Sequence, residues 1–307
     1  MENYKELWKG RIDGDSPLVK RLHQKISFDT AIDEGDIILH GFAVDQGVKL
    51  NKGRIGAQNG AEAIRKNMAN FPVVSSTLLI KDHGDVSLHE EGLKKTQEYL
   101  GEKVNRILQN GGKSLLLGGG HEVTYGHYLG IKQAYEGKRI GVINIDAHFD
   151  NREVNDEIGP TSGTGFYQIK TQDEVETLHI GIQRNSNTLQ LFDTAHRLDM
   201  KYILSDELYY ENLPTVFLAI DQLLENVDVL YLTICMDVFN ASIAPGVSAQ
   251  AYNGIFADHT FLTFYRHILR ADKLVALDIA EVNPSLDVND ITARLAASLA
   301  NEWLMLL

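Results

Sequence analysis

Residues 139–150, RIGVINIDAHFD, decide the fold class of this chain, because an apolar run leads directly into a cluster of acids and a histidine. Apolar runs of this length without polar alternation are typical of parallel strands that helices cover on both faces. The same pattern occurs in residues 230–236, LYLTICM. Both stretches therefore predict an α/β protein with buried parallel strands.

Eight apolar runs lie along the chain, and each is expected to form a strand. They are Ile37–Val44, Thr77–Ile80, Ser114–Leu117, Arg139–Ile145, Thr177–Ile182, Lys201–Leu204, Asp228–Met236 and Lys273–Ile279. The segments with helical spacing are one that contains Leu100, Val104, Ile107 and Leu108, and then Thr188–Asp199, Leu213–Glu225, His259–Ala271 and Asp290–Leu306. Their alternation predicts one three-layer α/β/α domain over residues 1–307, with ligands bound beyond the carboxyl ends of the strands.

The composition limits the classes of partner. The chain has 307 residues, with 29 Lys and Arg against 42 Asp and Glu, which gives a net charge of −13. Such an acidic chain argues against nucleic-acid and anionic-membrane partners. The single cysteine, Cys235, excludes an intrachain disulfide and fits a reducing compartment. The polar start MENYKELWKG does not match a signal peptide, and no apolar run approaches the roughly 20 residues of a membrane span. We therefore expect a soluble cytoplasmic protein.

The acids and histidine after the run at 139–145 are candidate metal ligands. Asp146, His148 and Asp150 are spaced two apart, so in an extended chain their side chains point the same way. Two carboxylates and an imidazole suit a divalent metal ion. A polar loop whose acids face solvent explains this motif alone equally well.

Three other expected strand ends also carry polar residues. His121 follows three glycines in a loop that lacks the spacing of a phosphate-binding loop. Cys235 and Asp237 end another strand, and Glu281 follows the last one. Taken singly, Cys235 fits a small buried residue, and Glu281 fits a surface acid. Together with the acids at 146–150, they predict one site at the carboxyl edge of the sheet.

Several blocks resemble a known family. GGGHEVTYG (118–126), NIDAHFD (144–150), the Asp237 segment and DIAEVNP (278–284) are similar to signature blocks of the arginase, agmatinase and formimidoylglutamase (ureohydrolase) family. The resemblance begins near residue 41 and covers nearly the whole chain. It implies a three-layer α/β/α sandwich around an eight-stranded parallel sheet, in agreement with the eight apolar runs. It also implies two Mn²⁺ ions that share a water or hydroxide, which attacks the amidine carbon.

The resemblance also implies roles for individual residues. His121 and Asp150 would bind one metal, His148 and Asp237 the other, and Asp146 both. Glu281 matches the acid that contacts the amidine or guanidine nitrogen, and Glu281 and His148 are the residues expected to be catalytic.

Cys235 departs from the family pattern, because it stands where the family has an aspartate that bridges both metals. A thiolate is softer than a carboxylate and favours Zn²⁺, Fe²⁺ or Co²⁺ over Mn²⁺. Three outcomes are open: two Mn²⁺ with Cys235 as a ligand, a different or single metal, or a site with weak catalysis. We favour an intact site with two metals, because every other ligand position is filled.

Other blocks resemble the formimidoylglutamase branch rather than arginase. They are Gly41–Lys66, His148–Arg152, Thr161–Phe166, Gly181–Thr188 and Ala244–Ala249. Phe166 stands where arginases have a histidine. This branch hydrolyses N-formimidoyl-L-glutamate to L-glutamate and formamide in histidine degradation.

That substrate carries two carboxylates, so the site needs cations. We expect Arg152 and Arg184 to bind these carboxylates, with hydrogen bonds from Ser162 and Thr164. Further candidates are Lys49, Lys52 and Arg54, although a basic loop is usually only solvated.

Rival interpretations remain open. An agmatinase or guanidino-acid hydrolase is the nearest one, and a metal-dependent binding protein without turnover is another. A dinucleotide-binding protein is disfavoured because no glycine fingerprint follows the first strand. The family resemblance also implies a homo-oligomer.

Overall fold

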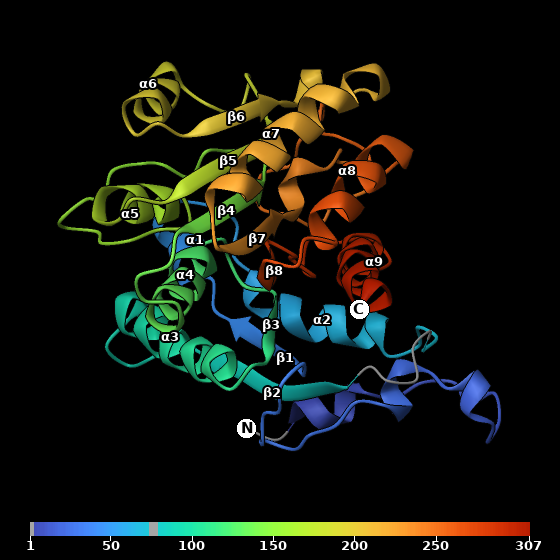
Figure 1. The fold of residues 1–307 in the computed structure, drawn as a ribbon. Coiled ribbons are helices and arrows are strands. Elements are labelled where there is room, and N and C mark those ends of the chain that lie inside the picture. Colours follow the sequence, from blue (N-terminus) through green and yellow to red (C-terminus); the bar gives the residue numbers. More distant parts are fainter. Residues whose placement is uncertain (1–2, 74–78) are drawn as a thin grey trace.

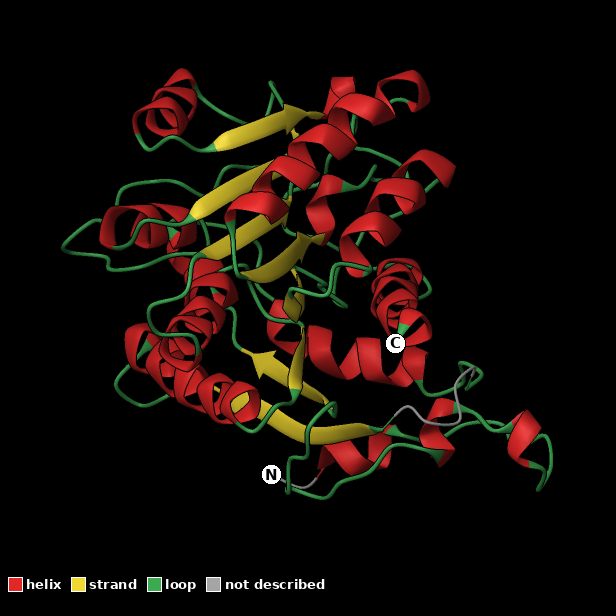
Figure 2. Cartoon of the chain, viewed as in Figure 1, coloured by secondary structure: helices red, strands yellow, loops and turns green. Residues whose placement is uncertain are grey.

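Across residues 3–73 and 79–307, which this computed structural model describes, eight strands form one sheet (Figure 2). The strands are β1 (Ile37–Ala43), β2 (Ile80–Ser87), β3 (Lys113–Leu117), β4 (Ile140–Ile145), β5 (Glu176–Ile182), β6 (Lys201–Leu204), β7 (Val229–Cys235) and β8 (Leu274–Ala280). Their order is β2-β1-β3-β8-β7-β4-β5-β6, and every neighbouring pair is parallel. The expected eight-stranded parallel sheet is confirmed.

Helices cover both faces of this sheet (Figure 1). On one face lie α2 (Gly60–Met68), α7 (Leu213–Asn226), α8 (His259–Leu269) and α9 (Ile291–Leu306). On the other lie α3 (Leu93–Gln109), α4 (Val123–Ala134), α5 (Gly165–Gln172) and α6 (Leu189–Arg197), and the short α1 (Gln46–Leu50) follows β1. The three-layer α/β/α fold is therefore confirmed. Among the described helices, none is both long and apolar enough to cross a membrane.

Most side chains of the central strands are apolar because the sheet separates two cores. In β4, Ile143 and Ile145 belong to the core beneath α7, α8 and α9, whereas Val142 belongs to the core beneath α3 to α6. Successive side chains of a strand point to opposite faces, so both faces of β4 are buried, and its one polar side chain, Asn144, lies 3.2 Å from Nδ1 of His179. The apolar end of the chain follows the same logic, since Trp303 and Leu304 are buried in the first core.

The structure corrects the bounds of the strand that was expected at Thr77–Ile80. Residues 77–78 lie outside the described residues, and the strand begins at Ile80 and runs to Ser87. This is the edge strand β2, whose sequence IKDHGDVS is too polar to be recognised by apolar periodicity. Its Asp82 is nevertheless buried, because Arg65 forms an ion pair with it at 2.8 Å and Trp8 donates a hydrogen bond at 2.7 Å.

The strand order gathers the predicted site. β3, β8, β7 and β4 are adjacent at the centre of the sheet, although they are far apart in the sequence. After β3 the chain moves on to β4, and β8 and β7 later fill the space between these two strands. Ligands of open α/β sheets bind beyond the carboxyl ends of strands at such a reversal of strand order.

Candidate metal centre

Glycines allow the loop after β3 to turn back over the sheet edge. Gly118 and Gly119 have φ values of 73° and 83°, in the left-handed region that favours glycine. A Cβ on Gly118 would lie 2.2 Å from the backbone nitrogen of Ala61, so a side chain cannot be accommodated there. This tight turn places His121 above the ends of the central strands.

Asp146, directly after β4, is the centre of the cluster. Its Oδ2 lies 3.0 Å from Nδ1 of His121, and its Oδ1 lies 3.5 Å from Nδ1 of His148. The backbone N–H of His148 also donates to Oδ1 at 2.8 Å. The two oxygens of one buried carboxylate therefore face two different histidines.

Two groups of metal-binding side chains share this aspartate. His121, Asp146 and Cys235 form one group, and Asp146, His148 and Asp237 form the other, with ligand atoms within 4.8 Å of one another in each. Asp150 joins the first group, because its Oδ2 lies 2.9 Å from Nδ1 of His121. The structure thus brings together all six residues that the sequence suggested as metal ligands.

The two histidines of the cluster are surrounded by buried carboxylates. Burial would lower the pKa of His121, but the hydrogen bonds that its ring donates to Asp146 and Asp150 outweigh burial and raise this pKa well above its usual range. The pKa of His148 is raised well above its usual range for a similar reason, since Asp237 and Asp146 outweigh its burial. Without a metal ion, the neighbouring carboxylates thus favour the protonated form of both imidazoles.

The acidic side chains of the cluster outnumber its two histidines. Burial, followed by repulsion from Asp237 and Glu122, raises the pKa of Glu281 well above its usual range. Burial and the neighbouring carboxylates, Asp146 first among them, likewise raise the pKa of the Cys235 thiol well above its usual value. Oδ1 of Asp237 and Oε2 of Glu281 are buried without a hydrogen-bond partner among the described residues. A divalent cation would bind the buried oxygens that lack a partner and would offset the excess of acids, so the residues present fit a metal site.

Two site residues have unusual backbone conformations. Glu281 has a φ of 67° and Asp150 a φ of 45°, both in the left-handed region that non-glycine residues rarely adopt. Glu281 is fixed by two hydrogen bonds: its N–H donates to the carbonyl of Gly119 at 2.8 Å, and its Oε1 accepts from the N–H of His121 at 3.0 Å. Such strain is held in place by the surrounding structure and is frequent at functional sites.

A cavity of about 360 Å³ opens above the cluster. Among the residues predicted from the sequence, those that line it are His121, His148, Asp150, Arg152, Ser162, Cys235, Asp237 and Glu281. Asp146 is fully buried at its base. The mouth carries Arg152 and Lys52, neither of which forms an ion pair with a described residue.

Arg184 and Thr164 do not line this cavity. The Arg184 side chain is 69% exposed and lies 3.6 Å from Asp206, on the outer surface. The Thr164 hydroxyl is buried and accepts a hydrogen bond from the N–H of Thr161 at 2.9 Å, within its own turn. The expectation that these two side chains face the substrate is therefore not met by the structure.

Arg54 also lines the cavity, but its guanidinium is occupied. It donates to the carbonyls of Val247 and Ser248 at distances of 2.7 to 2.9 Å and joins two loops. Asn51 also lines the cavity and was not predicted; it donates to the Ser162 hydroxyl at 3.1 Å. Its place next to Lys52 in the basic loop was the one available signal.

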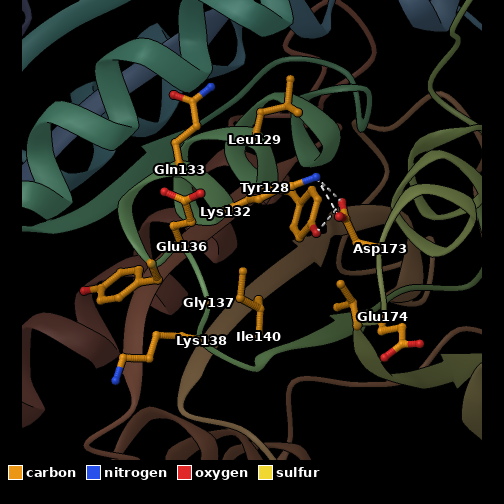
Figure 3. Close-up of a pocket in the computed structure, with 12 residues that line it drawn as sticks. Tyr128, Leu129, Lys132, Gln133, Glu136, Gly137, Lys138, Ile140, Asp173 and Glu174 are labelled. Carbon is orange, nitrogen blue, oxygen red and sulfur yellow. Dashed lines mark hydrogen bonds and ion pairs between the residues drawn. The ribbon is translucent and has the colours of Figure 1, made fainter.

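A larger cavity of about 540 Å³ lies at the amino ends of β4 and β5, at the opposite edge of the sheet from the cluster. Figure 3 shows the residues that line it. It is bounded by the end of α4 and by the residues that lead into β4 and β5. The carboxylate of Asp173 in this cavity already has partners, since it accepts a hydrogen bond from Tyr128 at 2.8 Å and forms an ion pair with Lys132 at 2.6 Å. Neither group of candidate metal ligands reaches this cavity.

Comparisons with known proteins agree with this geometry. Residues 35–306 match the model of the arginase family. The chain is 42% identical over 300 residues to the formimidoylglutamase of Staphylococcus carnosus (strain TM300), with 95% of each chain covered. The crystal structure of formimidoylglutamase from Bacillus subtilis has a TM-score of 0.86 at 25% identity, and covers 96% of this chain and 94% of its own. The structure of Trypanosoma cruzi formiminoglutamase with Mn²⁺ has a TM-score of 0.82 at 22% identity and shares the fold, covering 94% and 98% of the two chains. This chain therefore belongs to the arginase family.

Proposed function

We propose that this chain is a hydrolase that converts N-formimidoyl-L-glutamate and water to L-glutamate and formamide. The observation that carries the proposal is that two acid–histidine groups, which share Asp146, lie below two cationic side chains that form no ion pair with a described residue and line the same cavity. The identity of 42% to a formimidoylglutamase over 95% of each chain supports this substrate. The reaction belongs to histidine degradation.

The proposed cofactor is a pair of Mn²⁺ ions. His121, Asp150 and Cys235 would hold one ion, His148 and Asp237 the other, and Asp146 both. A relative of the same fold that binds Mn²⁺ supports this choice of metal. Two ions bound in this way would lower the pKa of a shared water and make it a nucleophile near neutral pH.

The residues of the chain would bind and orient the substrate. The formimidoyl group is cationic, and the unpartnered Oε2 of Glu281 is a suitable acceptor for its N–H groups. Arg152 and Lys52 would each take one carboxylate at the mouth, with a hydrogen bond from Ser162. Glu281 and His148 are proposed as catalytic residues because both side chains face the cavity above Asp146.

The charges at the mouth separate this proposal from the nearest rival. Agmatine is cationic at both ends, so it would place a positive group against Arg152 and Lys52. A substrate with two carboxylates matches both side chains, which otherwise form no ion pair with a described residue.

The test is an assay of glutamate and formamide release by the full chain, stripped with a chelator and reloaded with Mn²⁺. We expect turnover of N-formimidoyl-L-glutamate and none of arginine or agmatine. Glu281→Gln is the matched control, and it should lose turnover while keeping its metal. Turnover of agmatine or arginine alone would overturn the substrate. No turnover with Mn²⁺, Co²⁺, Zn²⁺ or Fe²⁺ would favour a metal-dependent binding protein instead.

The proposal also includes a cytoplasmic enzyme with one catalytic domain over residues 1–307 that assembles as a homo-oligomer. Cys235 is the single cysteine of the sequence and is buried as a free thiol, so the chain has no intrachain disulfide that would require an oxidising compartment, and this supports a reducing one. The oligomer rests on the family resemblance.

A further inference from the structure

The loop of residues 45–56, here called the mouth loop, has a buried base and an exposed tip. At its tip, Asn51 and Lys52 are exposed and line the cavity. At its base, Asp45 is buried, and its Oδ2 accepts a hydrogen bond from the N–H of Gly56 at 2.6 Å. The two ends of the mouth loop are therefore joined.

The mouth loop rests on the segment between β3 and α4, which also carries His121. The N–H of Gly120 donates to the carbonyl of Val44 at 2.9 Å, and the N–H of Gly119 donates to the carbonyl of Ala57 at 3.2 Å. These two bonds hold the residues on either side of the mouth loop. One segment thus positions both a proposed metal ligand and the base of the loop at the cavity mouth.

Glu122 supplies a third contact between this segment and the mouth loop, through its side chain. Its carboxyl group is fully buried, and Oε1 accepts a hydrogen bond from the N–H of Gly47 in α1 at 2.7 Å. A Cβ on Gly47 would lie 2.6 Å from Cδ of Glu122, so this close approach requires a glycine. The roles assigned above to the site residues do not include this bond.

The third contact fixes the direction in which the mouth loop points. A loop that is held only at its two ends can rotate about the line that joins them, and a contact away from this line prevents the rotation. Asn51 and Lys52 directly follow α1, so the orientation of this short helix determines where both side chains lie. A loop that is already held in its bound conformation loses less conformational entropy when a ligand binds.

We propose that Glu122 is a positioning residue that holds Lys52 at a fixed distance from the cluster and thereby selects substrates by length. The inference rests on the proposed function, in which Lys52 and Arg152 each bind one substrate carboxylate. With the mouth loop fixed, a substrate whose carboxylates are one methylene closer together would not reach both side chains.

The test compares two substrates of the full chain reloaded with Mn²⁺: N-formimidoyl-L-glutamate and its aspartate analogue, which is one methylene shorter. Wild type should prefer the glutamate compound by about 5- to 30-fold in kcat/KM, because the shorter compound loses one carboxylate contact with an exposed cation. Glu122→Ala should raise KM for the glutamate compound by about the same factor, affect kcat less, and narrow the preference. Glu122→Gln keeps an oxygen that accepts from Gly47 and should retain the wild-type values.

Two measurements without substrate separate the mouth loop from the metal centre. Hydrogen exchange of the peptide that covers residues 45–56 should be about 10-fold faster in Glu122→Ala, because the N–H of Gly47 loses its buried acceptor. The exchange should stay close to that of wild type in Glu122→Gln. Mn²⁺ binding, measured by equilibrium dialysis, should be unchanged in both variants.

Glu302→Ala is the matched control. Glu302 is a buried glutamate of α9 that forms an ion pair with Arg266 at 2.7 Å, on the opposite face of the sheet from α4. Its replacement should change neither KM nor the exchange of the mouth loop, and circular dichroism of every variant will show that it is folded.

Wild-type KM and substrate preference in folded Glu122→Ala would overturn the inference. A loss of Mn²⁺ affinity in this variant would overturn it too, because the effect would then arise at the neighbouring ligand His121. If wild type turns over neither substrate, the proposed function fails, and the exchange rates decide separately whether Glu122 anchors the mouth loop.

Discussion

Replacement of Arg152 by alanine is expected to raise KM for N-formimidoyl-L-glutamate with a smaller effect on kcat. Arg152 lines the cavity mouth and forms no ion pair with a described residue, so a substrate carboxylate can take its full hydrogen-bonding capacity. Hydrogen bonds to charged groups contribute about 1.5–3 kcal/mol. Because Arg152 is exposed, solvent screening reduces this contribution to about 1–2 kcal/mol. The expected increase in KM is therefore about 5- to 30-fold, since 1.4 kcal/mol corresponds to a factor of ten.

Steady-state kinetics with saturating Mn²⁺ measure this change, and two variants serve as controls. Arg152→Lys should give an intermediate KM, because lysine keeps the charge but loses the planar fork that binds a carboxylate at two points. Arg184→Ala should leave KM unchanged, because Arg184 lies outside the cavity beside Asp206. An unchanged KM in Arg152→Ala, or an equal rise in both alanine variants, would refute the assignment of this carboxylate site.

Two further predictions concern the metal and the pH. Loss of a group that contacts a metal ligand, but not the metal itself, weakens metal binding about 10- to 100-fold, so Cys235→Ala, which removes a proposed ligand, should weaken it by more than this. Cys235→Asp should shift the metal preference from Zn²⁺ towards Mn²⁺. Metal analysis after dialysis checks both variants, and an unchanged metal content in Cys235→Ala would show that the thiol is no ligand. Burial lowers the pKa of His179 to about 3, so the unfolded chain takes up a proton at this histidine below about pH 6.5 and stability falls as the pH drops towards 3. His179→Gln should remove about 1.4 kcal/mol of the loss that wild-type metal-free protein shows between pH 7.5 and 5.5 in urea unfolding, and an unaltered pH dependence would contradict this.

The sequence predicts the central strands well because burial on both faces leaves mostly apolar residues there. The same criterion fails for β2, where a polar edge strand is stabilised by the ion pair between Asp82 and Arg65. Arg65 is fully buried on α2, 17 residues earlier in the chain, and nothing in local periodicity indicates that it would neutralise this strand. A long-range pairing of buried charges is not visible from spacing.

The metal cluster was predictable for a topological reason, whereas the substrate contacts were not. Ligands that directly follow parallel strands gather at one edge whatever their loops do next. Arg184 and Lys52 depend on the path of a loop instead. Lys52 reaches the mouth from a residue with a φ of 64°, and Arg184 turns outward to Asp206. The two carboxylates of the expected substrate indicated that cations are needed, but the path of the backbone decides which of them line the cavity.

Cys235 changes how the two halves of the cluster are joined. A bridging aspartate offers two oxygens, one for each metal, whereas a cysteine would have to serve both metals with one sulfur. In this chain Cys235 groups with His121 and Asp146, and the second group, with His148 and Asp237, does not contain it. Asp146 is then the shared member of both groups among the described residues, with Oδ2 towards His121 and Oδ1 towards His148. In the proposed site Asp146 would therefore join the two ions, and the thiol would act mainly on the ion that His121 would hold.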